Sequence, residues 1–195
     1  MPTAANPNLL SVDWSKIPAP VDDGAASHLQ GAEVPDIALT ATDGTQVSLA
    51  RLAGRVVVFA YPRTGEPGKP SLVDDWDMIP GARGCTPQTC AFRDLHTVLI
   101  EAGAARVLGL STQDTAYQAE AAGRLHLPFA LLSDAGLALT RALGLPTMQV
   151  AGLTLIKRLA LVIDDGRIAK VFYPVFPPDR NAADVHAWLG EHRRR

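Results

Sequence analysis

Residues 55–61 read Arg-Val-Val-Val-Phe-Ala-Tyr, and this run constrains the fold more than any other stretch of the chain. β-branched and aromatic residues favour strands. Because no polar residues alternate with the apolar ones, both faces of such a strand must be covered by other parts of the chain. The run therefore predicts a central strand of a sheet, and Pro62 ends it because proline cannot donate to a strand ladder.

Strand and helix patterns alternate through the rest of the chain. Apolar runs predict buried strands over 106–111 and 129–134, and Asp-Gly turns predict two hairpins, over 37–49 and 159–172. Apolar residues at helical spacing predict helices over 87–102, 115–125 and 136–143, and a last helix through Gly190 that Asn181 or Asp179 would cap. This order predicts an α/β fold with a partly parallel sheet and antiparallel edges.

The chain holds two cysteines, Cys85 and Cys90, where an irregular loop gives way to a helical pattern. Pro87 suits a first helical turn, where its missing N–H costs nothing. Cys85 would then lie at the N-terminal edge of the helix, and the unpaired N–H groups there favour a thiolate. The thiolate is the reactive form of cysteine, so this position indicates a nucleophile.

The spacing of the two cysteines adds a constraint. On one intact helix they would be separated by about 7.5 Å along the axis and roughly 140° around it, whereas a disulfide needs Cα atoms within about 4.4–6.8 Å. The pair cannot bridge unless the first turn unwinds. A reduced structural pair and a pair that reacts, unwinds and bridges both stay open at this point. Two cysteines without a nearby histidine make a poor metal site.

Length and composition fit one elaborated domain. The chain has 195 residues, 47% of them hydrophobic. We assign 1–30 to an N-terminal extension, with Leu9, Leu10, Trp14 and Ile17 as apolar anchors, and 31–195 to the domain. Within the domain, residues 63–84 form a long connection (hereafter the inserted segment), and connections of this length are usually functional or mobile.

The net charge and the N-terminal sequence limit the expected binding partners and the expected location in the cell. The net charge of −2 gives no electrostatic reason to expect binding to nucleic acid or to a membrane surface. Residues 1–7 show no basic region followed by an apolar one, so we expect no signal peptide. We therefore expect a cytoplasmic protein, in which a reactive thiol pair serves redox chemistry rather than structural stapling.

Several motifs in a fixed order resemble the peroxiredoxins, most closely the bacterioferritin-comigratory-protein or Q-type group. The resemblance covers about residues 32–189. Its motifs are Val57–Pro62, Gly84-Cys85-Thr86 with Cys90, Phe92-Arg93-Asp94, Gly109-Leu110-Ser111 with Asp114, Leu127-Pro128-Phe129, Leu132-Ser133-Asp134, and Arg158 before Leu161–Asp164. The resemblance implies a thioredoxin-like fold with a central mixed sheet flanked by helices.

It also implies a thiol peroxidase that reduces hydrogen peroxide and organic hydroperoxides. Cys85 would be the peroxidatic cysteine, and Cys90 would resolve its sulfenic acid as an intramolecular disulfide. Arg158 would hold the thiolate and donate to the peroxide, and Pro62 would shield the pocket. A thioredoxin- or glutaredoxin-type reductant would restore both thiols. No cofactor or metal is expected, and a monomer or weak homodimer would suffice.

Two departures from the family pattern stand out. A Thr or Ser is usual three residues before the peroxidatic cysteine, whereas here the residue is Ala82. Thr64 is our candidate for the displaced hydroxyl, and Ser71 is a second one. The inserted segment, with Trp76 at its centre, is longer than in the family. Both departures keep an alternative open, a redox-sensing or thiol-exchange protein with weak peroxidase turnover.

Overall fold

A computed structural model of the chain describes residues 12–193. The N-terminal residues 1–7 and the predicted anchors Leu9 and Leu10 lie outside this range. The α-helices are α1 Cys85–Asp94, α2 His96–Glu101, α3 Thr115–Arg124, α4 Ala138–Leu143 and α5 Asn181–Glu191. The strands are β1 Ala38–Ala41, β2 Gln46–Ser48, β3 Arg55–Ala60, β4 Arg106–Ser111, β5 Leu131–Ser133, β6 Thr147–Val150, β7 Leu153–Ile156, β8 Leu159–Asp164 and β9 Arg167–Phe172.

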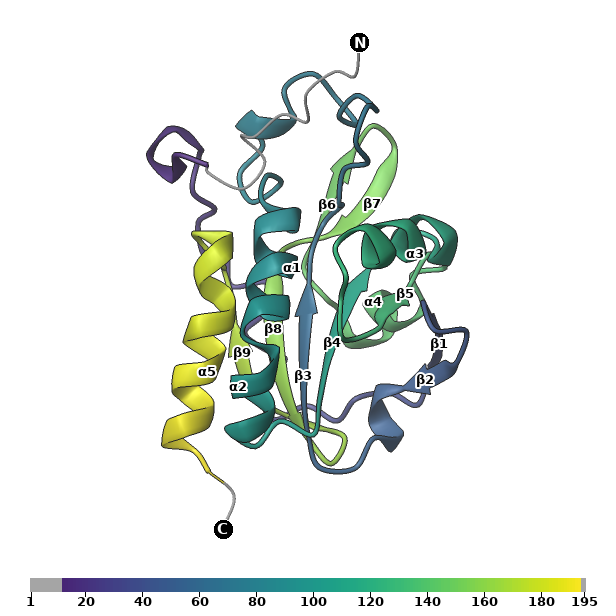
Figure 1. Cartoon of the computed structure of the whole chain (residues 1–195), viewed down its shortest axis with the longest axis vertical. Helices are drawn as coiled ribbons and strands as arrows, with labels where there is room; N and C mark the ends of the chain where they lie inside the picture. The colour runs from purple at the N-terminus through teal and green to yellow at the C-terminus, as the bar shows by residue number, and fades with distance from the viewer. Residues whose placement is uncertain (1–11, 194–195) are drawn as a thin grey trace.

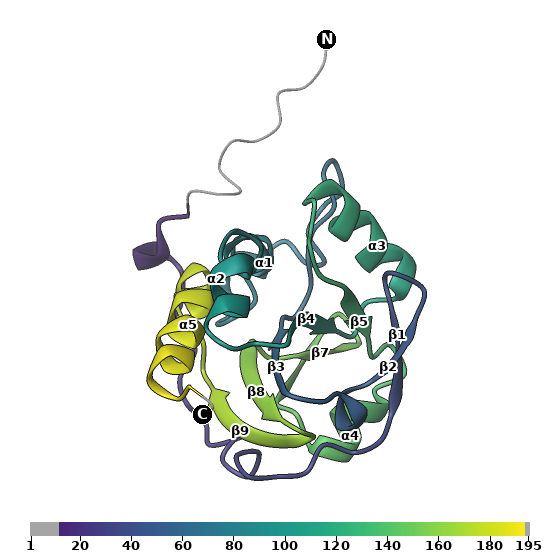
Figure 2. The same ribbon diagram turned by 60° about the horizontal axis from the view of Figure 1, so that its bottom comes forward.

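Seven strands form one mixed sheet in the order β2-β1-β5-β4-β3-β8-β9. β3 pairs in parallel with β4, and β4 with β5, while β8, β9, β1 and β2 are antiparallel to their neighbours. The sheet is flanked by helices (Figures 1 and 2). The predicted α/β architecture with a partly parallel centre and antiparallel edges is confirmed.

The predicted central strand is β3, and every one of its residues is buried. Val56, Val58 and Ala60 point into one apolar cluster, which includes Leu139 and Leu143 of α4. Their neighbours Val57 and Phe59, followed by Tyr61, point into a second cluster with residues of α1, α2 and α5. Because successive side chains of a strand alternate between faces, this one run supplies apolar surface to both layers of the core.

Helix bounds differ from the prediction in three places. The segment predicted as one helix over 87–102 begins at Cys85 and divides at Leu95, whose ψ of 5° interrupts the helix between α1 and α2. The short helix α4 begins two residues later than predicted, after Leu137 in the left-handed region. The predicted caps of the last helix are wrong: Arg180 is its N-cap, and a 3₁₀ turn, Pro178–Arg180, precedes it.

The strands also differ in detail. β5 is shorter at both ends than the predicted 129–134. The hairpin of β6 and β7 was not predicted. Its turn residues Ala151 and Gly152 both have positive φ, the geometry of a type I′ turn, but alanine is rare there and so gives no sequence signal.

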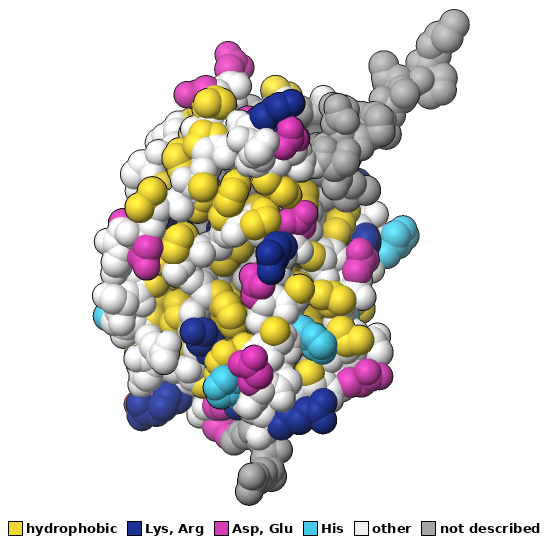
Figure 3. All heavy atoms as spheres, turned by 90° about the vertical axis from the view of Figure 1, so that its left-hand side faces the viewer, with side chains coloured by type: hydrophobic (Ala, Val, Ile, Leu, Met, Phe, Trp, Pro, Cys, Tyr) yellow, Lys and Arg dark blue, Asp and Glu magenta, His cyan; other side chains and the backbone are white. Residues whose placement is uncertain are grey.

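The N-terminal extension lies against the body where it is described. The indole N–H of Trp14 donates to Asp179 at 3.1 Å, and its ring meets Phe176 edge-on. Further along, Leu29 is fully buried in the core. On the face seen in Figure 3, acidic and basic side chains are interspersed among hydrophobic ones. No helix within residues 12–193 has the length and apolar character needed to cross a membrane.

Close packing around Gly109 of β4 gives a test of the core. A Cβ atom there would lie 2.4 Å from Leu131 Cδ2 and 3.0 Å from Phe59 Cζ. We expect Gly109→Ala to lower the free energy of unfolding by about 1–3 kcal/mol through overpacking. Gly123→Ala is the matched control, because nothing lies within 4 Å of its added methyl group and alanine stabilises helices by about 0.5–1 kcal/mol over glycine. Denaturant unfolding measures both, and equal effects would contradict the packing described.

Candidate active site

Cys85 lies at the N-terminal edge of the helix, as the sequence predicts, but as the first residue of α1 it stands inside the helix, with Gly84 as the N-cap. Gly84 has a φ of 104°, which favours glycine. A Cβ atom there would also lie 2.5 Å from Pro178 and 2.8 Å from the Trp14 ring. The chain therefore turns into the helix in a space that admits only glycine, and this turn fixes the position of the cysteine.

The sulfur of Cys85 is buried and receives two N–H groups. The backbone N–H of Arg63 lies 3.4 Å from Sγ, and Nη2 of Arg158 lies 3.3 Å from it. The Ala82 carbonyl, at 3.6 Å, accepts from the thiol form. A thiolate is an acceptor only, so the two N–H donors and the helix N-terminus stabilise the charged form of this cysteine.

Arg158 is itself buried and held by several groups. The carbonyl oxygens of Gly81, Ala82 and Arg83 lie 3.0–3.2 Å from Nη2 and share its two N–H groups with the sulfur, while Nη1 donates to Gln88 Oε1 at 2.5 Å. Within the described part of the chain no carboxylate forms an ion pair with this guanidinium; Asp164, at the far end of the strand that Arg158 precedes, pairs with Arg55. The positive charge therefore remains available to the sulfur of Cys85.

Strand register explains why these residues meet. In the antiparallel pair β3–β8, Ala60 is the partner of Leu159. The residues that follow β3 therefore lie beside the residue that precedes β8, which is Arg158. Tyr61, Pro62 and Arg63 thus reach the same edge of the sheet as Arg158, and α1 starts from that edge (Figure 1).

Cys90 lies on the same helix and is also buried, and both thiols are free. Burial raises the pKa of the Cys90 thiol, so this sulfur stays protonated at neutral pH. Both cysteines belong to the uninterrupted helix α1. The geometric conflict predicted from their spacing therefore applies: they can bridge only after the first turn unwinds.

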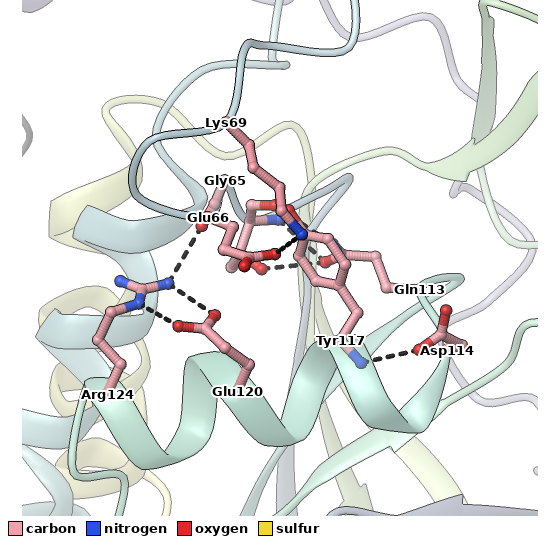
Figure 4. A network of polar contacts seen from close by, with 9 residues as sticks. Gly65, Glu66, Lys69, Gln113, Asp114, Tyr117, Glu120 and Arg124 are labelled. Atoms are coloured by element: carbon pink, nitrogen blue, oxygen red, sulfur yellow. Dashed lines mark hydrogen bonds and ion pairs between the residues drawn. The ribbon is translucent and has the colours of Figure 1, made fainter.

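The other predicted site residues take different positions. Pro62 is buried immediately after β3, next to Arg63. Thr64 is buried, and both its backbone N–H and its hydroxyl donate to Gln113 Oε1, at 3.0 and 3.1 Å. Its hydroxyl is thus engaged on the side of α3, where Figure 4 shows Gln113. Ser71 instead lines the cavity beside Cys85.

This cavity has a volume of about 110 Å³. It is lined by the start of α1 and by the inserted segment, including Trp76, Asp77 and Arg83. A second cavity of about 100 Å³ lies on another side of Arg158, but Cys85 is not among its lining residues. The first cavity is therefore the one from which a small molecule can reach the sulfur.

Gln88 and Asn181 are site residues that the sequence interpretation missed. Gln88 is buried, accepts from Arg158, and donates through Nε2 to Asn181 Oδ1 at 2.9 Å. Its spacing of three residues from Cys85 places it on the same helix face, which could have identified it. Asn181 comes from α5, and no local pattern connects it with the site.

Comparisons with known proteins agree on the family. The family model described as Redoxin matches residues 29–187. A chloroplastic peroxiredoxin Q of Oryza sativa subsp. japonica is 34% identical over 80% of this chain, which spans 64% of that relative's length. A chloroplastic peroxiredoxin Q of Sedum lineare is 32% identical over 80% of this chain and 75% of its own length.

A solved structure gives the same answer for the fold. The crystal structure of peroxidoxin BcpB from Mycobacterium tuberculosis is 30% identical, covers 85% of this chain and 98% of its own, and has a TM-score of 0.68. This likeness confirms the thioredoxin-like fold expected from the sequence, and the relatives confirm the resemblance to the Q-type group. The chain belongs to the redoxin family and, within it, to the peroxiredoxin Q group.

Proposed function

We propose that this protein is a thiol-dependent peroxidase with Cys85 as its nucleophile. The observation that carries the proposal is the environment of Sγ, at a helix N-terminus with N–H donors from Arg63 and Arg158 and no competing carboxylate on the guanidinium. Membership of the peroxiredoxin Q group supports it. A buried thiolate next to a small cavity suits attack on a small electrophile.

In the first step the Cys85 thiolate attacks one peroxide oxygen. An S–O bond forms, the O–O bond breaks, and the leaving oxygen takes a proton to give water or an alcohol. Cys85 is oxidised by two electrons to a sulfenic acid. Because negative charge moves from sulfur to the leaving oxygen, N–H groups already aimed at this site stabilise the transition state.

In the second step Cys90 resolves the sulfenic acid. The Cys90 sulfur attacks Cys85, water leaves, and a disulfide forms within one chain after the first turn of α1 unwinds. A thioredoxin- or glutaredoxin-type dithiol then reduces this disulfide by exchange. Both sulfurs come from a single chain, so a monomer or weak homodimer is sufficient for the cycle.

A second candidate function is a redox sensor or thiol-exchange protein that oxidises at Cys85 but turns over poorly. The observation in its favour is the engagement of the Thr64 hydroxyl with Gln113, together with Ala82 at the usual hydroxyl position. Sustained consumption of peroxide with thioredoxin and its reductase would support the peroxidase, whereas fast oxidation without turnover would support the sensor.

Replacing each cysteine separates their roles. We expect Cys85→Ser to abolish peroxide consumption, because the Arg63 N–H and the Arg158 guanidinium donate to the Cys85 sulfur and not to that of Cys90. Cys90→Ser should allow one oxidation and then accumulate sulfenic or over-oxidised Cys85, because nothing resolves it. Intact mass spectrometry after peroxide treatment distinguishes an added oxygen from the loss of two hydrogens. Peroxide turnover by the Cys85→Ser variant would contradict the assignment.

The role of Arg158 is tested by the rate at which reduced Cys85 is oxidised. We expect Arg158→Met to slow this step by about 10²–10³-fold, the usual effect of removing one preorganised donor. Arg158→Lys should recover only part of the rate, since lysine lacks the planar fork that spans sulfur, amide and carbonyls. Arg51→Met is the control, because Arg51 forms an exposed ion pair with Asp36. A folded Arg158→Met variant that oxidises at the wild-type rate would contradict this role.

A further inference from the structure

The inserted segment, residues 63–84, forms one side of the cavity over Cys85. Ser71, Trp76, Asp77 and Arg83 of this segment line the cavity together with the first turn of α1. Asp77 and Arg83 form an ion pair with each other. In Figure 1 the segment rises above the N-terminal end of α1. A peroxide must therefore pass these side chains to reach the sulfur.

The segment is held at both of its ends. At its start, Arg124 of α3 donates to the Gly65 carbonyl at 3.1 Å (Figure 4), and the Thr64 N–H donates to Gln113 Oε1. At its end, Arg158 donates to the carbonyls of residues 81–83.

The middle of the segment consists of consecutive tight turns. The backbone N–H of Trp76 donates to Val73 O at 3.2 Å, that of Ile79 to Trp76 O at 3.3 Å, and that of Ala82 to Ile79 O at 3.0 Å. Trp76 is half-buried in this series of turns. These turns place Trp76 in the wall of the cavity.

The size of the cavity limits what can enter. Its volume is about 110 Å³ and it is open to solvent on one side, whereas a closed cavity of about 150 Å³ binds benzene and a water molecule takes about 30 Å³. Hydrogen peroxide fits within it with a few waters. A hydroperoxide that carries an aromatic ring on a branched carbon must leave that ring at the mouth of the cavity or displace Trp76 from its wall.

The polarity of the cavity walls also favours hydrogen peroxide over hydroperoxides with bulky apolar tails. Apart from Trp76, Cys85 and Pro87, every side chain that lines the cavity is polar or charged: these are Arg63, Ser71, Asp77, Arg83 and Thr86. No Val, Leu, Ile or Met side chain is among the lining residues. An apolar tail would have to desolvate the Asp77–Arg83 pair without gaining aliphatic contacts, which is unfavourable. Hydrogen peroxide can instead exchange hydrogen bonds with these groups as water does.

We propose that Trp76 and the Asp77–Arg83 pair make this protein selective for hydrogen peroxide and other small polar hydroperoxides over those with bulky apolar tails. This inference rests on the proposed peroxidase function and names the substrate class of the same site. Trp76 acts as a specificity-determining residue: it does not take part in the chemistry at Sγ, but it limits the space in front of it.

The test compares hydrogen peroxide with cumene hydroperoxide on the full chain. The second-order rate constant for oxidation of reduced Cys85 is measured for each by stopped-flow and intact mass, which needs no physiological reductant. We expect the wild type to favour hydrogen peroxide by at least about tenfold, the scale on which pocket size discriminates. Trp76→Ala should raise the ratio of the cumene to the hydrogen peroxide rate constant about tenfold, and Trp76→Phe should raise it less.

Met78→Ala is the matched control, because Met78 lies two residues away in the same segment but is 61% exposed and does not line the cavity. It should leave both rate constants unchanged. A wild-type ratio near one, or a folded Trp76 variant with the wild-type ratio, would overturn the inference. If Trp76→Ala does not fold, the ratio for Trp76→Phe decides. Failure of the wild type to react with either peroxide would instead refute the proposed function.

Discussion

The site depends on the contact between the Arg158 guanidinium and the sulfur of Cys85, 3.3 Å apart. One nitrogen of this guanidinium also donates to the carbonyls of residues 81–83, and the other reaches Gln88. A single buried cation thus joins the start of β8, the end of the inserted segment and the first turn of α1. Burial of an arginine without a carboxylate partner is costly. The carbonyls and the amide offset part of that cost, and the proposed thiolate form of Cys85 would offset more of it.

The same arrangement must release Cys85 after it has reacted. The first turn of α1 is held by the bond from the Gln88 N–H to the Gly84 carbonyl and by the Thr89 hydroxyl on the Cys85 carbonyl. Such bonds contribute about 0.5–1.5 kcal/mol each. In the proposed reaction the charge on a Cys85 thiolate would contribute as well, because Arg158 and the Arg63 N–H lie against the sulfur. Oxidation to a sulfenic acid would neutralise the sulfur, so the proposed reaction would itself weaken one of the interactions that keep the turn folded.

Much of this fold follows from local sequence. The remaining parts are determined by partners that lie far away in the sequence. The run Arg55–Tyr61 and the Asp-Gly turns predict the central strand and both outer hairpins, since periodicity and turn chemistry are local properties. The caps predicted for α5 fail for a physical reason. The Asn181 side chain accepts from Gln88, and Asp179 accepts from Trp14, 165 residues earlier in the chain. The hydroxyl of Thr64 is likewise directed by Gln113, 49 residues later. Long-range hydrogen bonds of this kind have no signature in the sequence.

Different parts of the inserted segment affect the entry of small molecules into the cavity and the hydrogen bonds to the Cys85 sulfur. It lies between Pro62, at the end of β3, and Cys85, at the start of α1, so both of its ends belong to the site. The donors to the sulfur come from Arg63, which directly follows Pro62, and from Arg158, which directly precedes β8. The middle of the segment, around Trp76, contributes no donor to Sγ among the described contacts but contributes a wall of the cavity. Changes in this middle part can therefore alter which molecules reach Cys85 while the groups that stabilise its thiolate stay in place.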